Sequence, residues 1–229
     1  MKIGYHGFAF PEGKTRYNDQ KLIALRDKLD PDKFSPFFAE FISDEFVQCD
    51  AILMAKEDVL ELLIHDIEKC ETRLERTVDE TERELLRKCL QHLEQEQPLF
   101  TGTFTEKEEE YLQAFGPLSW KPTAVIDTQP ETDEAIALML KTAGIMFFYT
   151  AGKKEVHAWP IRENATALEC AGKIHSDLAR GFIKADVVLF DDFISVFNMQ
   201  EARQKGLVKL VDRDYTIPDS AVIEIRFNV

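Results

Sequence analysis

The chain has 229 residues, 45% of them hydrophobic, and a formal net charge of −14. This length and composition can bury a core in one large domain or two small ones, without covalent cross-links. The acidic balance excludes broad attraction to a phosphate backbone, which depends on Lys and Arg. Eleven basic and twelve acidic residues lie from Phe147 onward, which leaves −13 on the first 146 residues. Any contact with nucleic acid is therefore expected in the C-terminal part.

The spacing of the cysteines and the lengths of the apolar runs indicate in which cellular compartment the protein is expected. The four cysteines are far apart, without a Cys-x-x-Cys pair: Cys49, Cys70, Cys89 and Cys170. This spacing predicts neither a disulfide framework nor a zinc site, and it fits a reducing cytoplasm. The first ten residues lack the apolar run of a signal peptide, and no stretch approaches the roughly 18 apolar residues of a membrane span. We expect a soluble, cytoplasmic protein with no membrane partner.

The first 55 residues predict part of an α/β layer. Residues 1–6 read as a strand, residues 7–15 as a loop, and residues 22–29 as a helix that stops before Pro31. Residues 49–54 are compatible with a buried strand. The five phenylalanines between positions 34 and 46 predict core packing, and a run this dense could also cover a homodimer surface.

Two amphipathic helices follow. Apolar residues recur at spacings of three and four within residues 57–76 and again within residues 85–93. Between them, Thr77 and Glu80 have the spacing of a capping box. The pattern predicts an antiparallel helical hairpin whose many charges form a solvated outer face.

The remaining residues change from helical to β-rich patterns. Residues 105–115 predict a helix, residues 121–126 a strand and residues 131–142 another helix. Beyond them, one helix is expected over residues 166–174, and β-rich runs occupy residues 145–150, 156–161, 187–190 and 222–227. A few strands with a single crossing helix in about 80 residues is the β-grasp, or ubiquitin-like, arrangement.

Several separated motifs in this last part are specific. They are FYTAGKKEVHAW from Phe148, AGKIHSD from Ala171, RGFIKA from Arg180 and IEIRFNV from Ile223. Together they resemble the C-terminal TGS (DUF933-type) domain of the Obg-like ATPase (YchF) family, and weaker similarity extends upstream. The resemblance implies an α/β protein (α+β overall) with three parts: a reduced P-loop-like α/β portion (residues 1–55 and 98–145), an inserted hairpin (56–97) and a β-grasp TGS domain (146–229).

The same resemblance implies a nucleotide site for ATP or GTP with Mg²⁺ at Gly7, Gly13, Lys14 and Thr15. A Walker A loop encloses four residues between its first Gly and the Gly-Lys pair, whereas five lie between Gly7 and Gly13. No Asp-x-x-Gly occurs between Thr15 and Cys49, and Thr128 stands where the family's base-reading Asn is expected. We therefore expect weak nucleotide binding at most, and assign no catalytic residue and no metal ligand.

Basic residues near the C-terminus form a candidate face for a ribosome or structured RNA. These residues could instead be ordinary solvent-exposed charges. His175 and Asp177 could form an acid–base pair, or they could cap a turn of the backbone. The candidate residues are Lys153, Lys154, Arg162, His175, Arg180 and Lys184, with Lys173 in the same set.

These observations favour a binding protein with a ribosome-associated or RNA-related role. One alternative is a working P-loop ATPase or GTPase with an atypical loop. Another is a regulatory partner of a full-length family member, with the hairpin as its protein contact.

Overall fold

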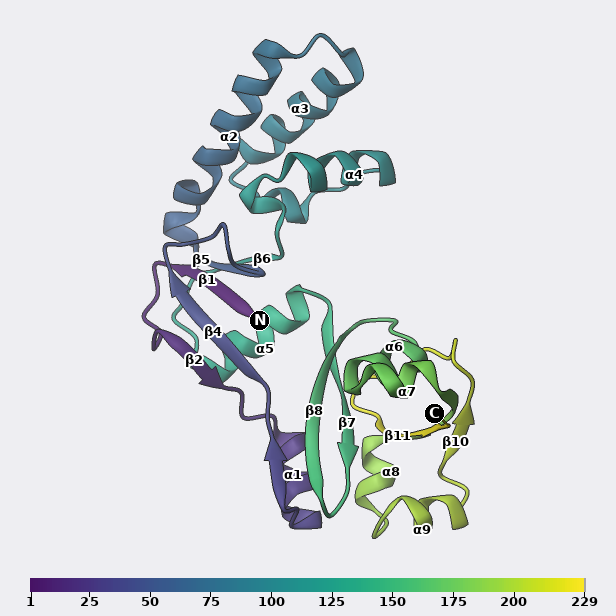
Figure 1. Ribbon diagram of the computed structural model, residues 1–229. Coiled ribbons are helices and arrows are strands. Elements are labelled where there is room, and N and C mark those ends of the chain that lie inside the picture. The colour runs from purple at the N-terminus through teal and green to yellow at the C-terminus, as the bar shows by residue number, and fades with distance from the viewer. Residues whose placement is uncertain (229) are drawn as a thin grey trace. The chain divides into compact units, whose positions relative to one another are not determined.

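The computed structural model describes residues 1–228 and divides into two compact units (Figure 1). The parallel-sheet unit comprises residues 1–15 and 39–143, and the mixed-sheet unit comprises residues 16–38 together with the chain from residue 144. Both units combine helices with a sheet, so the expected α/β class is confirmed. Among the described residues, no helix is long and apolar enough to span a membrane.

The sheet of the first unit has the order β2-β4-β1-β5-β6. Its strands are β1 (Lys2–His6), β2 (Gly13–Arg16), β4 (Phe38–Ser43), β5 (Ala51–Ala55) and β6 (Thr123–Ile126). Strand β1 pairs in parallel with β4 and β5, and β5 pairs in parallel with β6. Every residue of β5 is buried, as expected for a central strand covered on both faces. Helix α5 (Thr132–Thr142) follows β6 and packs on β5 and β6.

The predicted hairpin is present as α2 (Val59–Arg76) and α3 (Glu80–Leu93). Helix α4 (Glu106–Phe115) and the short turn Leu118–Trp120 follow, and the buried Asp66 of α2 accepts hydrogen bonds from the N–H groups of Leu118 and Ser119, both at 2.7 Å. The predicted capping box at Thr77 and Glu80 is wrong. Asp79 caps α3 instead, because its carboxylate accepts from two N–H groups of the first turn.

The sheet of the second unit has the order β10-β9-β11-β7-β8-β3. Its strands are β3 (Lys33–Ser35), β7 (Ile145–Ala151), β8 (Glu155–Arg162), β9 (Phe182–Val188), β10 (Lys209–Val211) and β11 (Val222–Phe227). Strands β7 and β8 form an antiparallel hairpin, β11 lies parallel to β7, and β9 runs antiparallel to both β11 and β10. The four β-rich runs predicted here therefore all contain strands.

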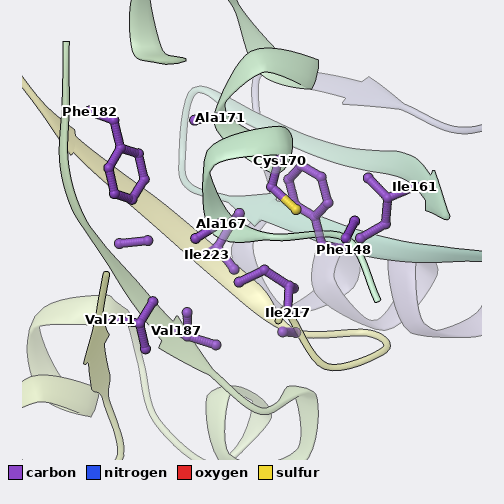
Figure 2. Close-up of a cluster of buried hydrophobic side chains, with 13 residues drawn as sticks. Phe148, Ile161, Ala167, Cys170, Ala171, Phe182, Val187, Val211, Ile217 and Ile223 are labelled. Carbon is purple, nitrogen blue, oxygen red and sulfur yellow. The ribbon is translucent and has the colours of Figure 1, made fainter. Parts of the chain in front are cut away.

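Helix α6 (Ala167–Ile174) crosses this sheet and supplies much of its core. Figure 2 shows Cys170 of α6 beside Phe148 of β7, within a cluster that also contains Val187 and Ile223. The remaining helices are α1 (Gln20–Leu29), α7 (Ser176–Arg180), α8 (Phe190–Ile194) and α9 (Met199–Gln204).

The boundary expected for the α/β portion needs one correction, because residues 16–38 pack with the second unit. The side chain of Asp19 makes two kinds of contact there: it caps α1, and it accepts a hydrogen bond from the buried Tyr149 hydroxyl at 2.6 Å. Burial raises the pKa of Tyr149, so this hydroxyl remains a donor. Strand β3 then pairs with β8, with Phe34 opposite Val156.

We predict that Asp19→Ala lowers the free energy of unfolding by about 2–4 kcal/mol. The lost cap costs about 1 kcal/mol, and the unpaired Tyr149 hydroxyl costs about 1–3 kcal/mol. The control is Asp27→Ala on the same helix, which removes only an exposed contact with Arg26 and should cost less than about 1 kcal/mol. Urea unfolding followed by circular dichroism measures both. Equal effects would contradict an anchoring role for Asp19.

Candidate functional site

The carboxyl ends of three parallel strands meet at one edge of the first sheet. Strand β1 ends at His6, β5 at Ala55 and β6 at Ile126. In open α/β sheets this edge is where ligands bind, because the loops that leave the strands diverge there. A cavity of about 590 Å³ lies at this edge, lined by Gly7, Phe8, Ala55, Lys56, Glu57, Val59, Leu60, Glu96, Asp127 and Gln129.

The loop after β1 is tied to the segment after β6. The Ala9 N–H donates to Gln129 Oε1 at 2.8 Å, and Gln129 Nε2 donates to the Ala9 carbonyl oxygen at 3.3 Å. Gln129 belongs to the segment aligned above with a base-reading motif. In this structure its amide is engaged by the loop, and the neighbouring Asp127 lies within 3.3 Å of Lys56 Nζ.

Gly7 has a backbone conformation and a close contact that only glycine accommodates easily. Its φ is +77°, and a Cβ atom added there would lie 2.3 Å from Asp58 Oδ2 and 2.4 Å from Ala55 Cβ. The absent side chain therefore allows the end of β5 and the 3₁₀ turn Lys56–Asp58 that follows it to approach the end of β1. As a result, the Asp58 carboxylate lies beside Gly7, which lines the cavity.

Four titratable side chains gather around the end of β1. His6 Nδ1 is in a short contact with Asp44 Oδ1, while His6 Nε2 lies 3.0 Å from Glu61 Oε2 and 4.0 Å from Asp58 Oδ2. The hydrogen bond to Asp44 raises the pKa of His6 above its ordinary value; Glu61 and Asp58 act in the same direction, whereas burial opposes it. The same hydrogen bond lowers the pKa of Asp44.

The residues predicted to bind nucleotide are separated by the structure. Gly7 lines the edge cavity, but Gly13, Lys14 and Thr15 belong to strand β2, and Lys14 is exposed. The expected loop over residues 7–15 is therefore corrected to a loop followed by a strand. No helix follows Thr15 directly; α1 begins at Gln20, where Asp19 provides the cap, and belongs to the other unit.

The basic residues predicted to form a partner face are also dispersed. Lys153 and Lys154 lie in the turn between β7 and β8, whereas Arg162 ends β8, about 25 Å along the strand. Three of the set make ion pairs: Lys153 with Asp30, Arg180 with Asp177, and Lys184 with Asp212. His175 accepts a hydrogen bond from the Asp177 N–H at 3.1 Å, which is the capped-turn alternative.

The sequence analysis did not predict this cluster of His6, Asp44, Asp58 and Glu61. His6 is the last residue of a short strand, and Asp58 and Glu61 have the i, i+3 spacing that places two carboxylates on one helical face. That spacing was the available signal. It is common on surface helices, and only the parallel pairing of β1 with β5 brings His6 to the same place.

The fold and the edge cavity define a class of protein: a two-unit α/β protein with a helical hairpin inserted in a parallel-sheet unit. Residues 145–228 match the family model YchF-GTPase_C, described as a protein of unknown function (DUF933). This part of the chain is therefore similar to the YchF C-terminal domain, and the resemblance to the YchF family is confirmed.

Curated relatives match less than half of the chain. The ribosome-binding ATPase YchF of Bacillus subtilis is 40% identical over 97 residues, which is 42% of this chain and 26% of the relative. The protein of the same name from Mycoplasma genitalium is 39% identical over 97 residues, again 42% of this chain and 26% of the relative. The matched segment thus spans about a quarter of the length of these relatives.

A solved structure matches over most of the chain. The Schizosaccharomyces pombe YchF GTPase gives a TM-score of 0.77, covering 95% of this chain and 88% of that chain, at 17% sequence identity. This likeness shows that the two proteins share a fold.

We predict that Gly7→Ala destabilises the protein more than Gly13→Ala. Both glycines have positive φ, but a Cβ atom at Gly13 would meet nothing within 4 Å. Backbone strain alone should cost about 1–2 kcal/mol at Gly13, and the clash at Gly7 should add about 1–3 kcal/mol. Free energies of unfolding from urea titrations compare the two variants. Equal losses of unfolding free energy in the two variants would mean that the close approach of Asp58 does not require a glycine at position 7.

Proposed function

We propose that this protein binds the ribosome through its mixed-sheet unit. The observation that carries the proposal is the match to relatives named ribosome-binding ATPases, at 36–40% identity over 85–101 residues, together with the YchF C-terminal domain model that matches residues 145–228 of this unit. Ribosome binding would place the protein in the cytoplasm. We propose a binding role, and we assign no catalytic residue.

The strand topology supports treating this unit as a β-grasp, TGS-type module. The first and last strands, β7 and β11, are parallel neighbours in the middle of the sheet. Strand β8 lies next to β7 on one side of this central pair, and β9 and then β10 lie beyond β11 on the other side. In the sequence, α6 lies between β8 and β9. This is the mixed sheet expected for a ubiquitin-like module, with β3 added at its edge.

The charge distribution favours the same unit as the contact with ribosomal RNA. The parallel-sheet unit has 12 basic and 26 acidic residues, a net charge of −14 that opposes approach to phosphates, whereas the mixed-sheet unit has 16 of each and is neutral. Within the mixed-sheet unit, Lys154, Arg162 and Lys173 are exposed and stand outside the ion pairs described above. They are available to contact phosphate oxygens.

We predict that the triple charge reversal Lys154→Glu, Arg162→Glu, Lys173→Glu weakens ribosome binding at least tenfold. Each lost phosphate contact should also reduce the slope of log affinity against log salt by roughly 0.9 or less. The measurement is co-sedimentation with purified ribosomes at several salt concentrations.

The matched control reverses three exposed lysines of the parallel-sheet unit: Lys14, Lys107 and Lys141. It changes the net charge by the same amount, and its binding should fall by less than about threefold. If the control lost binding instead, the contact would lie on the parallel-sheet unit with its hairpin. Absence of co-sedimentation at low salt by the unaltered chain would contradict the proposal and favour a role as a protein partner through the hairpin.

As a second function, we propose weak binding of ATP or GTP with Mg²⁺ in the edge cavity. The supporting observation is its position at the carboxyl ends of β1, β5 and β6, with Gly7 and Lys56 in its lining. The lining also carries the carboxylates of Glu57, Glu96 and Asp127, which repel phosphates. This balance supports an affinity far below that of an intact P-loop.

We predict dissociation constants on the order of 100 µM or weaker for MgATP and MgGTP in isothermal titration, which corresponds to about −5.5 kcal/mol. Lys56→Ala should remove the binding heat, because its ammonium is the cation in the cavity lining. The control Lys14→Ala should leave it unchanged, since Lys14 is exposed in β2. Tight binding that is lost in Lys14→Ala, accompanied by hydrolysis, would instead establish a working P-loop enzyme.

A further inference from the structure

The side chains at the end of β1 have the spacing of a metal-ligand set. One ligand atom each from His6, Asp58 and Glu61 lies within 4.8 Å of the others. Nitrogen and oxygen ligands sit at roughly 2.0–2.2 Å from Zn²⁺ in tetrahedral geometry, which places two ligands roughly 3.3–3.6 Å apart. The observed separations from His6 Nε2, 3.0 Å to Glu61 and 4.0 Å to Asp58, lie on either side of this range. Small side-chain rotations would bring all three atoms onto one ion.

The orientation of the His6 ring favours a cation at Nε2. Asp44 contacts Nδ1, so the Nδ1–H donates to a carboxylate and Nε2 faces Glu61 and Asp58. A carboxylate that holds the far nitrogen of a ligating histidine is the usual support of a zinc-bound imidazole. Three carboxylates around one imidazole also leave an excess of negative charge, even when the ring carries a proton. A divalent ion would neutralise that excess.

The supporting backbone holds these ligands on regular elements. His6 ends β1, Asp58 ends the 3₁₀ turn that follows the buried strand β5, and Glu61 lies in the first turn of α2. The lack of a side chain at Gly7 lets Asp58 reach its position. Ligands held by strands and helices keep their geometry better than ligands on loops.

We propose that His6, Asp58 and Glu61 bind one divalent transition-metal ion of the Zn²⁺ or Co²⁺ type, with Asp44 as the residue that positions His6. The imidazole ligand favours these ions over Mg²⁺ and Ca²⁺, which prefer oxygen ligands. Three protein ligands leave a further coordination position for water or an anionic ligand. Gly7 lines the edge cavity and lies beside Asp58, so we place this open position toward the cavity. The proposal is independent of ribosome binding.

The test is titration of the full chain with Co²⁺, followed by visible absorption, and with Zn²⁺, followed by calorimetry. We expect one equivalent of either ion to bind, with absorption bands typical of nitrogen and oxygen ligands and without cobalt–thiolate bands. Glu61→Gln should weaken binding at least tenfold, and Asp44→Asn by about 10–100-fold through the loss of His6 positioning. Millimolar Mg²⁺ should not displace the bound ion.

The matched control is Glu68→Gln, an exposed carboxylate on the same helix, which should change the affinity by less than twofold. Glu61 is 65% exposed in its side chain, so its replacement should preserve the fold, and circular dichroism checks this. The proposal is overturned if no stoichiometric binding occurs, if Glu61→Gln and Asp58→Asn bind as tightly as the unaltered chain, or if thiolate bands place the ion on cysteines.

Discussion

The parallel pairing of β1 with β5 is the constraint on which the rest of the first unit depends. It places the ends of both strands at one edge of the sheet, with His6 opposite Met54. Because only the 3₁₀ turn Lys56–Asp58 separates β5 from α2, this turn passes close to the end of β1, and the glycine at position 7 makes room for it. The edge cavity, the cluster around His6 and the direction of the hairpin all follow from this pairing.

Elements with strong periodicity could be predicted from the sequence. The hairpin, the buried strand β5 and the antiparallel pair β7 and β8 each have a local pattern that tertiary contacts do not overturn. The short strands β3 and β10 could not be predicted, since three residues carry no period and their pairing is set by distant partners. The loop predicted over residues 7–15 was wrong at Gly13 to Thr15 for a similar reason: a motif specifies composition, whereas pairing at a sheet edge decides conformation.

The same reasoning explains how much of the candidate site was accessible. Gly7, which the family resemblance predicts to bind nucleotide, lines the edge cavity, because the loop after the first strand lies at the carboxyl edge of the sheet; its binding of nucleotide stays a prediction. The cluster around His6 could not be predicted, because His6, Asp44 and Asp58 are far apart in the sequence and become neighbours only through the order of the strands in the sheet. Basic residues on the mixed-sheet unit were counted as one face, but the length of β8 separates Lys154 from Arg162.

The central position of β11 has a consequence for how the protein is made. Strand β11 pairs with β7 on one side and β9 on the other. Strand β7 also pairs with β8, and β8 pairs with β3 near the start of the chain. The middle of this sheet is therefore incomplete until residues 222–227 have been synthesised. Until then, β7 and β9 present unpaired edges and α6 lacks part of the surface it covers. The parallel-sheet unit, whose strands are all made by residue 126, can form much earlier, so the two units should acquire their structure at different stages of translation.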